Sequence, residues 1–150
     1  MKILAIASAA SGSALLYTFL DFFKYKNDTT LDVIFTKTAA EISLQETGRV
    51  CVPEGPIAHV YDNESFYSPP SSGSTFDYNV VVVIPASAGF LSRVSLGLSS
   101  NLAERSFDVA IKEGTKIVVV PREMPFSRIH LESLLRLSNL GVVICPATLS

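Results

Sequence analysis

The sequence has little charge, few cysteines and no basic region. Only 17% of its 150 residues are charged and 48% are hydrophobic, which argues against a disordered chain and allows a sizeable core. The net charge of −2, without a basic stripe interleaved with aromatic residues, argues against nucleic-acid binding. Cys51 and Cys145 lie far apart without metal-ligand spacing, so we expect neither a disulfide framework nor a metal site. We interpret them as free thiols of a cytoplasmic protein.

No apolar run in the sequence is long enough to cross a membrane. The segment at residues 3–20 is interrupted by serines and a glycine, so it falls short of the roughly 18 consecutive apolar residues that a span needs. With Lys2 before it, the segment also has the outline of a signal peptide. We interpret it instead as a strand, a small-residue turn at residues 8–12 and a helix.

Runs rich in β-branched residues alternate with helix-length segments. This alternation is typical of an α/β fold with a parallel sheet. We expect one domain over residues 1–150, with an irregular active-site or subunit-contact loop at residues 51–73 that contains a short strand near residues 57–61. The other expected strands are residues 2–7, 31–36, 79–85, 116–121 and 141–145, and helical spacing occurs at residues 15–23, 91–112 and 129–140.

Small or hydroxyl-bearing residues follow three of these strands. Residues 8–12 form one turn, Thr36 follows the next strand, and residues 85–89 form a third turn. Such turns let the backbone approach a ligand, and the next helix points its amides at an anion. Small residues also allow tight packing, and a threonine at this position more often caps the following helix. Three such turns at one sheet edge nevertheless favour a ligand site.

Two charged side chains mark the end of another strand. Arg122 and Glu123 directly follow residues 116–121, at the edge where open parallel sheets bind their ligands. A guanidinium there suits a phosphate or carboxylate ligand. We therefore expect the chemistry of this protein at the carboxyl edge of the sheet.

The remaining candidate side chains have simpler explanations. Arg105 and Lys112 are seven positions apart and share a helix face, but solvated surface charge is the commoner reason for such a pair. His59 lies in the irregular segment, and His130 lies within an apolar helical stripe. We interpret both histidines as packing residues rather than catalytic bases.

Taken together, these segments resemble the UbiX-type flavin prenyltransferase family of the flavoprotein decarboxylase-like superfamily. The most specific segment is Pro121-Arg122-Glu123-Met124-Pro125-Phe126, which matches the family's Pro-Arg-Glu-Thr-Pro-Leu. The resemblance is collinear over nearly the whole chain. Its other segments are Ala9-Ala10-Ser11-Gly12, Thr36, Glu46-Thr47, Ser72-Gly73-Ser74, Pro85-Ala86-Ser87, the helical segment from Arg105 to Val109, Lys112-Glu113 and Ile129-His130-Leu131.

The resemblance implies a fold, a reaction and an assembly. The fold would be a flavodoxin-like or Rossmann-like three-layer sandwich with a mostly parallel sheet. The reaction would join the dimethylallyl group of dimethylallyl monophosphate to N5 and C6 of reduced FMN, without a metal. The prenylated FMN would pass to a partner decarboxylase, and the protein would form a homo-oligomer, either a trimer or a dodecamer.

The resemblance also assigns roles to individual residues. Glu123 would bring a proton to the departing phosphate, and Glu46 would act on the flavin adduct or stabilise its charge. The catalytic set is Glu46, Glu123 and Ser11; the FMN-binding set is Ala9, Ala10, Ser11, Thr36, Ser87, Ala88, Gly89, Phe90 and Arg122; and the phosphate-binding set is Arg105, Lys112 and Arg122.

The chain departs from the family pattern in four places. Ala9 replaces a glycine, Gly89-Phe90 replaces a lysine and a threonine, and Gly114-Thr115 stands where the family has a second arginine after Lys-Glu. The family pattern also continues beyond Ser150 with a segment that we expect this chain to lack. These departures leave a noncatalytic flavin-binding protein as one alternative. The other is an FMN-dependent cysteine decarboxylase, because Pro85-Ala86-Ser87-Ala88 resembles that family's Pro-Ala-Ser-Ala-Asn turn, although Gly89 stands where that family has asparagine.

Overall fold

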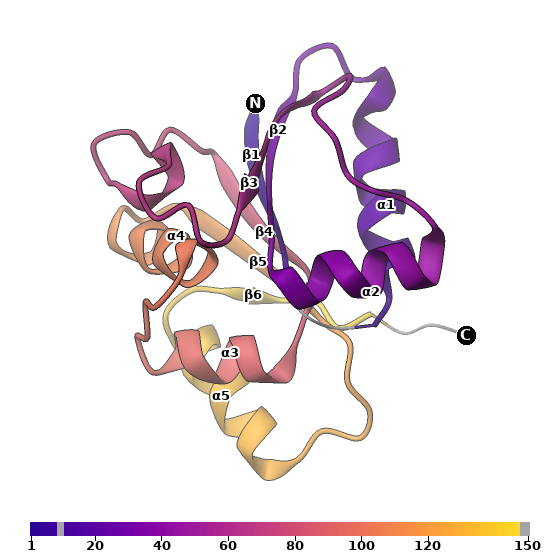
Figure 1. The fold of residues 1–150 in the computed structure, drawn as a ribbon. Helices are drawn as coiled ribbons and strands as arrows, with labels where there is room; N and C mark the ends of the chain where they lie inside the picture. The colour runs from indigo at the N-terminus through magenta and orange to yellow at the C-terminus, as the bar shows by residue number, and fades with distance from the viewer. Residues whose placement is uncertain (9–10, 148–150) are drawn as a thin grey trace.

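Six parallel strands form the centre of the computed structural model, which describes residues 1–8 and 11–147 (Figure 1). They lie side by side in the order β3-β2-β1-β4-β5-β6. Every neighbouring pair is parallel, which confirms the expected parallel sheet. The strands are β1 (Lys2–Ala7), β2 (Thr30–Phe35), β3 (Ile57–Asp62), β4 (Val80–Ala86), β5 (Lys116–Pro121) and β6 (Val143–Ile144).

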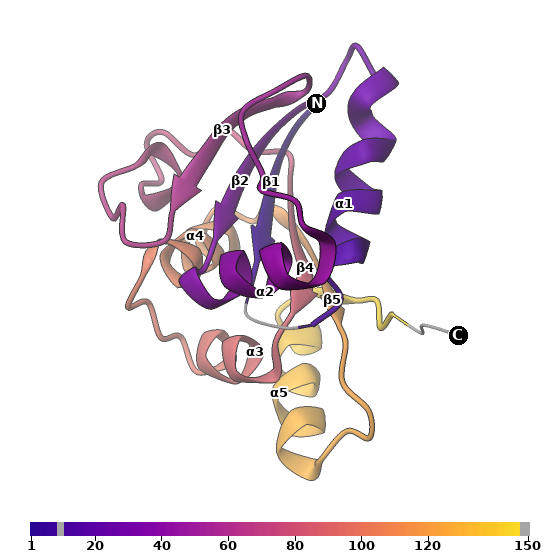
Figure 2. The ribbon, with the colours of Figure 1, turned by 45° about the vertical axis from the view of Figure 1, so that its right-hand side comes forward.

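Helices cover the sheet on both faces, which gives the three layers predicted for the fold (Figure 2). Helices α1 (Ser13–Phe22) and α2 (Lys37–Thr47) lie on one side. Helices α3 (Ala88–Ser95), α4 (Leu102–Lys112) and α5 (Arg128–Asn139) lie on the other. Two 3-10 turns, η1 (Phe23–Tyr25) and η2 (Pro69–Ser71), complete the elements. Among the helices of the described ranges, none combines the length and the hydropathy of a membrane span.

The apolar strands form these layers because alternate side chains point to opposite faces of a sheet. In β1, Leu4 and Ile6 belong to the core beneath α3, α4 and α5, whereas Ile3 and Ala5 belong to the core beneath α1. All four side chains are nearly or fully buried. The central strands are therefore apolar on both faces, as parallel strands covered by helices usually are.

Two expected elements differ from the structure. The helical spacing of residues 91–112 belongs to two helices, because the serines and asparagine at residues 99–101 favour a turn over a helix. There the Asn101 side chain accepts a hydrogen bond from the Glu104 amide at 2.9 Å and so begins α4. The strand expected at residues 141–145 is reduced to Val143–Ile144 at the edge of the sheet.

The strand order reverses direction between β1 and β4. In sheets of this type, ligands bind in the crevice beyond the carboxyl ends of the two strands that flank such a switch point. Buried Ser8 joins the two strand ends, since its hydroxyl donates to the Pro85 carbonyl at 3.1 Å and accepts from the Ser87 amide at 2.8 Å. The fold therefore brings the turns after β1 and β4 together.

Candidate active site

The turn after β1 contacts the residue that follows β5. Arg122 donates a hydrogen bond through its terminal nitrogen to the Ser11 hydroxyl. Its aliphatic part lies against Gly12, where a Cβ atom would stand only 2.7 Å from Arg122 Cδ. Gly12 has a φ of +103°, so the left-handed backbone and the close contact both require glycine. Arg122 thus reaches across the end of β4, which lies between β1 and β5 in the sheet.

Glu46 occupies the amino end of α1. Its carboxylate accepts hydrogen bonds from the Gly12 amide at 3.0 Å and from the Ser13 amide at 2.9 Å. Gly12 itself offers no capping side chain, so a residue from the last turn of α2 performs this role. The hydrogen bond from the Ser13 amide lowers the pKa of Glu46, and Arg122 adds a smaller effect of the same sign. Glu46 is therefore a carboxylate held beside Arg122 and Ser11.

The turn after β4 lies at the same crevice. Ser87 begins α3, and its hydroxyl accepts a hydrogen bond from the Phe90 amide at 3.2 Å. Ala88 is half-buried and Gly89 is exposed. The sequence thus correctly places Ser87, Ala88 and Gly89 at the carboxyl edge, next to Ser8, the first residue of the turn expected at residues 8–12.

Phe90 was expected to line the flavin site, and this expectation is wrong for its side chain. Phe90 is 1% exposed and packs edge-on against Phe107 of α4, with ring centroids 5.9 Å apart. It lies in the third position of α3, on the face that covers the sheet. Its apolar ring therefore stabilises the core. Ala9 and Ala10, also assigned to the flavin site, lie outside the described residues.

Thr36 begins α2 rather than presenting an unbonded hydroxyl. Its Oγ1 accepts from the Ala39 amide at 3.2 Å, which is the capping role that threonine commonly has at a helix start. Its side chain is half-buried at the end of β2, so Thr36 still lies on the edge where the other turns gather. A helix cap and a ligand contact are compatible at this position.

Glu123 lies on the exposed loop between β5 and α5. It borders a shallow depression that also includes Ala88 and Phe126. Nearby His130 closes a capping box with Ser127: its amide donates to the Ser127 hydroxyl at 3.2 Å, and its Nδ1 accepts from the Ser127 amide at 3.1 Å. His130 therefore has a structural role, in agreement with the sequence interpretation.

The two other expected phosphate residues do not join Arg122 within one chain. Arg105 lies on α4, where its Nε donates to the Ser71 carbonyl at 3.0 Å. Lys112 ends the same helix and pairs with Glu113 at 2.6 Å. It therefore precedes β5, whereas Arg122 follows β5, and a six-residue strand spans about 20 Å. Arg105 and Lys112 lie in the layer opposite α1 and point toward the segment around η2.

His59 is likewise a structural residue. Its Nδ1 lies 2.9 Å from Oδ1 of Asp32, a carboxylate in β2 that is only 1% exposed. The Tyr78 hydroxyl donates to the other oxygen of Asp32 at 2.6 Å. These contacts satisfy the buried Asp32 carboxyl group, so His59 has a structural role rather than that of a base, although its own side chain is 61% exposed and not packed in the core.

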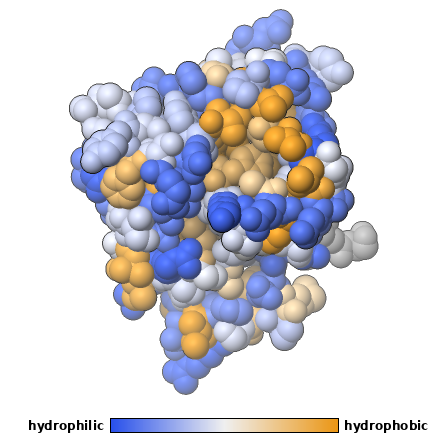
Figure 3. All heavy atoms as spheres, viewed as in Figure 1, coloured by the Kyte–Doolittle hydropathy of each residue, from blue (hydrophilic) through white to orange (hydrophobic). Residues whose placement is uncertain are grey.

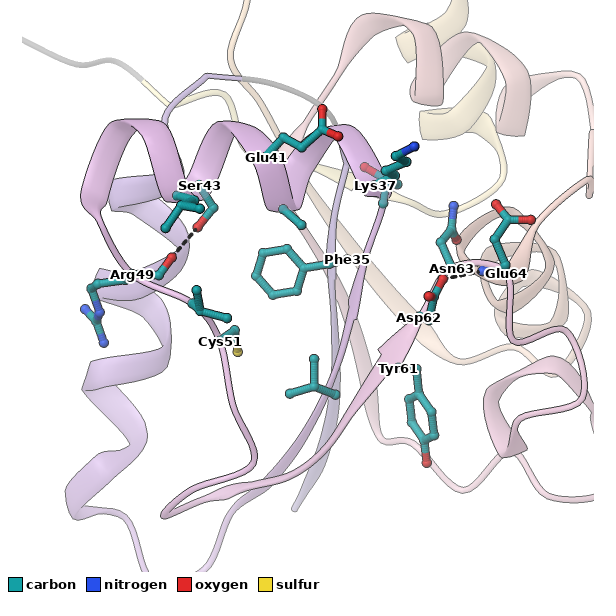
Figure 4. A pocket seen from close by; sticks show the side chains of 15 residues that line it. Phe35, Lys37, Glu41, Ser43, Arg49, Cys51, Tyr61, Asp62, Asn63 and Glu64 are labelled. Atoms are coloured by element: carbon teal, nitrogen blue, oxygen red, sulfur yellow. Dashed lines mark hydrogen bonds between the residues drawn. The ribbon is translucent and has the colours of Figure 1, made fainter.

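A hollow of about 650 Å³ lies between α2 and β3 (Figures 3 and 4). Apolar residues that include Phe35 and Val60 line it. Lys37 and Asp62 lie near one end (Figure 4). Cys51 lines it as well, and burial raises the pKa of the Cys51 thiol to about 11. The thiol is therefore protonated at neutral pH and is not a nucleophile.

The site geometry can be compared with known proteins. A sequence model of the Flavoprotein family matches residues 1–150. The flavin prenyltransferase UbiX of Methanocaldococcus jannaschii is 38% identical over 147 residues, which cover 97% of this chain and 78% of that protein. The chain belongs to the UbiX-type flavin prenyltransferase family. Membership accounts for the order of the matching turns along the chain.

Solved structures of the UbiX type share the whole fold. A dodecameric FMN-dependent UbiX-like decarboxylase from Escherichia coli O157:H7 superposes with a TM-score of 0.93 and 32% identity, over all of this chain and 81% of that one. AnUbiX (PadA1), solved in complex with FMN and dimethylallyl pyrophosphate, superposes with a TM-score of 0.87 and 26% identity, over 99% of this chain and 79% of that one. These matches confirm the flavodoxin-like architecture.

Proposed function

We propose that this protein is a flavin prenyltransferase that joins the dimethylallyl group of dimethylallyl monophosphate to N5 and C6 of reduced FMN. The observation that carries the proposal is the cluster of Ser11, Glu46 and Arg122 at the switch point of a UbiX-type chain. These side chains come from three separate elements, and all three belong to the set expected from the sequence. A guanidinium, a carboxylate and a hydroxyl together provide charge stabilisation and proton transfer.

The residues at the crevice fit a flavin phosphate. Ala88 has only a methyl group and Gly89 has no side chain, so a planar ring can approach the backbone there. Arg122 supplies a cation, and the amides that begin α3 supply donors. When bound, reduced FMN supplies the nucleophilic N5 and C6 atoms. We assign its wall to Ala9, Ala10, Ser11, Thr36, Ser87, Ala88, Gly89 and Arg122.

The side chains then have separable roles. Arg122 would stabilise the negative charge of the departing phosphate, and Ser11 would hold Arg122 in place through their hydrogen bond. Glu123 would deliver a proton to that phosphate. Glu46, kept ionised by the amides of α1, would accept a proton at the flavin or stabilise positive charge there.

Arg105 and Lys112 would act between copies of the chain. Both lie on α4, away from Arg122, so a phosphate bound at Arg122 of one copy could meet them only on a neighbouring copy. We therefore propose that the protein works as a homo-oligomer, a trimer or a dodecamer, and the E. coli relative is described as dodecameric. Prenylated FMN would pass to a partner decarboxylase. The free thiols of Cys51 and Cys145 suit a reducing compartment, so we place this reaction in the cytoplasm.

Anaerobic turnover tests the proposal. The protein is incubated with FMN, dithionite and dimethylallyl monophosphate, and the extracted flavin is analysed by mass spectrometry. We expect a mass gain of one prenyl unit, which disappears when the prenyl phosphate is omitted. FMN that binds and returns unmodified would contradict the transferase and favour a noncatalytic flavin-binding protein. Oxidative decarboxylation of a peptide ending in cysteine would instead favour the decarboxylase.

A further inference from the structure

The guanidinium of Arg93 lies over the first turn of α3. One of its terminal nitrogens is 3.4 Å from the place where a Cβ atom of Gly89 would stand. Helical side chains lean toward the amino end of their helix, so Arg93 points back to the turn after β4. Even a methyl group at position 89 would be in van der Waals contact with this nitrogen. Gly89 therefore leaves the guanidinium uncovered on the side that faces the carboxyl edge of the sheet.

A buried carboxylate fixes Arg93 in this position. Arg93 Nε donates to Glu104 Oε1, and the Glu104 side chain is fully buried at the start of α4. The other oxygen of Glu104 accepts from the Ser100 amide at 2.9 Å and from the Ser100 hydroxyl at 2.6 Å. Burial opposes the charge on Glu104, but these hydrogen bonds hold its pKa below the usual value. Glu104 thus orients the guanidinium through one nitrogen only.

The rest of the guanidinium remains available. The Arg93 side chain is 47% exposed, and its terminal nitrogens have no hydrogen-bond partner within residues 1–8 and 11–147. Arginine presents its donors in a planar fork that matches two oxygens of a phosphate. A guanidinium that is held at one nitrogen and open at two others loses little conformational entropy when it binds an anion.

The two helix starts at the switch point differ in the charge beside them. At α1 the carboxylate of Glu46 already takes the Gly12 and Ser13 amides. At α3 the Ser87 hydroxyl accepts from the Phe90 amide, and the nearby charged groups are Arg93, which Glu104 holds, and Glu123 beside Ala88. Within the described residues no carboxylate accepts a hydrogen bond from the first amides of α3. An anion bound there would therefore meet both the amides of a helix start and a guanidinium.

We propose that Arg93 binds the phosphate of a phosphate monoester at this crevice, as a residue additional to Arg122. The proposal rests on the proposed function for the identity of the monoester, which is either FMN or dimethylallyl monophosphate. Both carry the same dianionic group. The residue is a binding residue, and Glu104 positions it.

Comparison of FMN with riboflavin tests the proposal, because the two flavins differ by the phosphate alone. We expect Arg93→Gln to weaken FMN binding roughly tenfold or more, the scale of one charge-assisted hydrogen bond, while riboflavin binding changes less than about twofold. If the prenyl phosphate is the ligand, neither flavin is affected, and KM for dimethylallyl monophosphate rises roughly tenfold at an unchanged kcat. Either pattern supports a phosphate contact, and the two patterns identify its source.

Two further variants separate binding from folding. The single variant Arg93→Gln leaves the buried charge of Glu104 without its partner and can unfold for that reason. The double variant Arg93→Met, Glu104→Gln removes both charges of the pair, so it replaces the single variant in the same binding measurements if the single variant unfolds. Arg128→Gln is the matched control, because Arg128 is an exposed arginine that pairs with Glu132 on α5. It makes the same charge change and should alter neither flavin affinity nor KM.

Equal weakening of FMN and riboflavin, with an unchanged KM for the prenyl phosphate, would assign Arg93 a purely structural role and overturn the proposal. An Arg93→Gln variant that leaves the FMN affinity, the riboflavin affinity and the KM for dimethylallyl monophosphate unchanged would also overturn the proposal. Thermal unfolding in inorganic phosphate, against chloride of equal ionic strength, provides a test without flavin. Phosphate should stabilise the wild type more than Arg93→Gln even if prenyl transfer is absent. If inorganic phosphate stabilises the wild type and Arg93→Gln equally while prenyl transfer proceeds, the Arg93 proposal fails and the proposed function stands.

Discussion

Arg122 packs against Gly12 so closely that a Cβ atom at position 12 would stand 2.7 Å from Arg122 Cδ. The same arginine donates to Ser11, and the Gly12 amide donates to Glu46. The backbone of one glycine therefore sets the relative positions of a cation and a carboxylate. This contact makes Gly12 the residue at which the geometry of the site can be altered without removing a functional group.

Gly12→Ala should displace Arg122 and weaken FMN binding by roughly tenfold, the scale of one charge-assisted contact. The alanine also has to adopt a φ of +103°, which costs about 1–2 kcal/mol of folding stability. Gly141→Ala is the matched control, because Gly141 has a φ of +88° and no atom within 4 Å of its Cβ position. Both variants should lose stability in urea unfolding, but only Gly12→Ala should lose FMN affinity. If Gly12→Ala and Gly141→Ala bind FMN with equal affinity, the contact between Gly12 and Arg122 has no role in FMN binding.

Glu123→Ala should spare FMN binding and slow prenyl transfer by about a hundredfold or more, the usual scale for the loss of a positioned acid. Glu132→Ala is the control, since Glu132 is also an exposed glutamate of the same region but pairs with Arg128. Single-turnover transfer to reduced FMN measures the effect. Unchanged turnover in Glu123→Ala would remove Glu123 from the mechanism.

Asp21→Asn should reduce the dependence of the free energy of unfolding on pH at acidic pH. Hydrogen bonds from Arg49 and Lys24 lower the pKa of Asp21 from 3.8 to about 2. The folded state therefore binds fewer protons than the unfolded state between pH 4 and pH 2, and the stability from this pair is complete above pH 4 and lost as the pH falls through that window. Urea unfolding from pH 2 to 6 measures the slope. Arg49→Gln should give a smaller reduction of this slope, because Lys24 still pairs with Asp21, and a wild-type slope in both variants would refute the assignment.

Cys51 should react with iodoacetamide far more slowly than Cys145. Burial raises the pKa of Cys51 to about 11, so about one molecule in a thousand carries the thiolate at pH 8. Cys145 is exposed near the end of the described chain. Peptide mass spectrometry over time gives both rates, and unfolding in urea should make them similar. If Cys51 in the folded protein is modified as fast as Cys145, the Cys51 thiol is not kept buried in the hollow between α2 and β3.

The sequence predicts the strands well, because β1, β4 and β5 are runs of mainly apolar residues that are buried or half-buried between the helix layers. It also predicts Ser87 and Thr36 at the carboxyl edge, since a hydroxyl before a helix has a local capping role. Phe90 shows the limit of a motif. Alignment with the family's turn places it beside the flavin, but helical geometry turns its ring into the core.

Contacts between distant elements were beyond sequence reasoning. Nothing in the local sequence indicates that Glu46 caps α1, because the contact depends on how the end of α2 packs against the start of α1. Arg93 was missed for a similar reason: its importance comes from the empty space at Gly89 and from Glu104 on another helix. The separation of Arg105 and Lys112 from Arg122 likewise follows from the length of β5 and the layer in which α4 lies.

The hydrogen bond between Arg122 and Ser11 joins residues 111 positions apart, and this separation affects how the protein folds during its synthesis. During synthesis the turn at Ser11 leaves the ribosome long before β5 exists, and β4, which β1 needs as a neighbour, follows only after residue 80. A nascent chain thus exposes one edge of β1 until β4 has emerged. Flavin can stabilise this protein only after most of the chain has emerged, so a shortage of flavin would act on the finished fold rather than on its early folding.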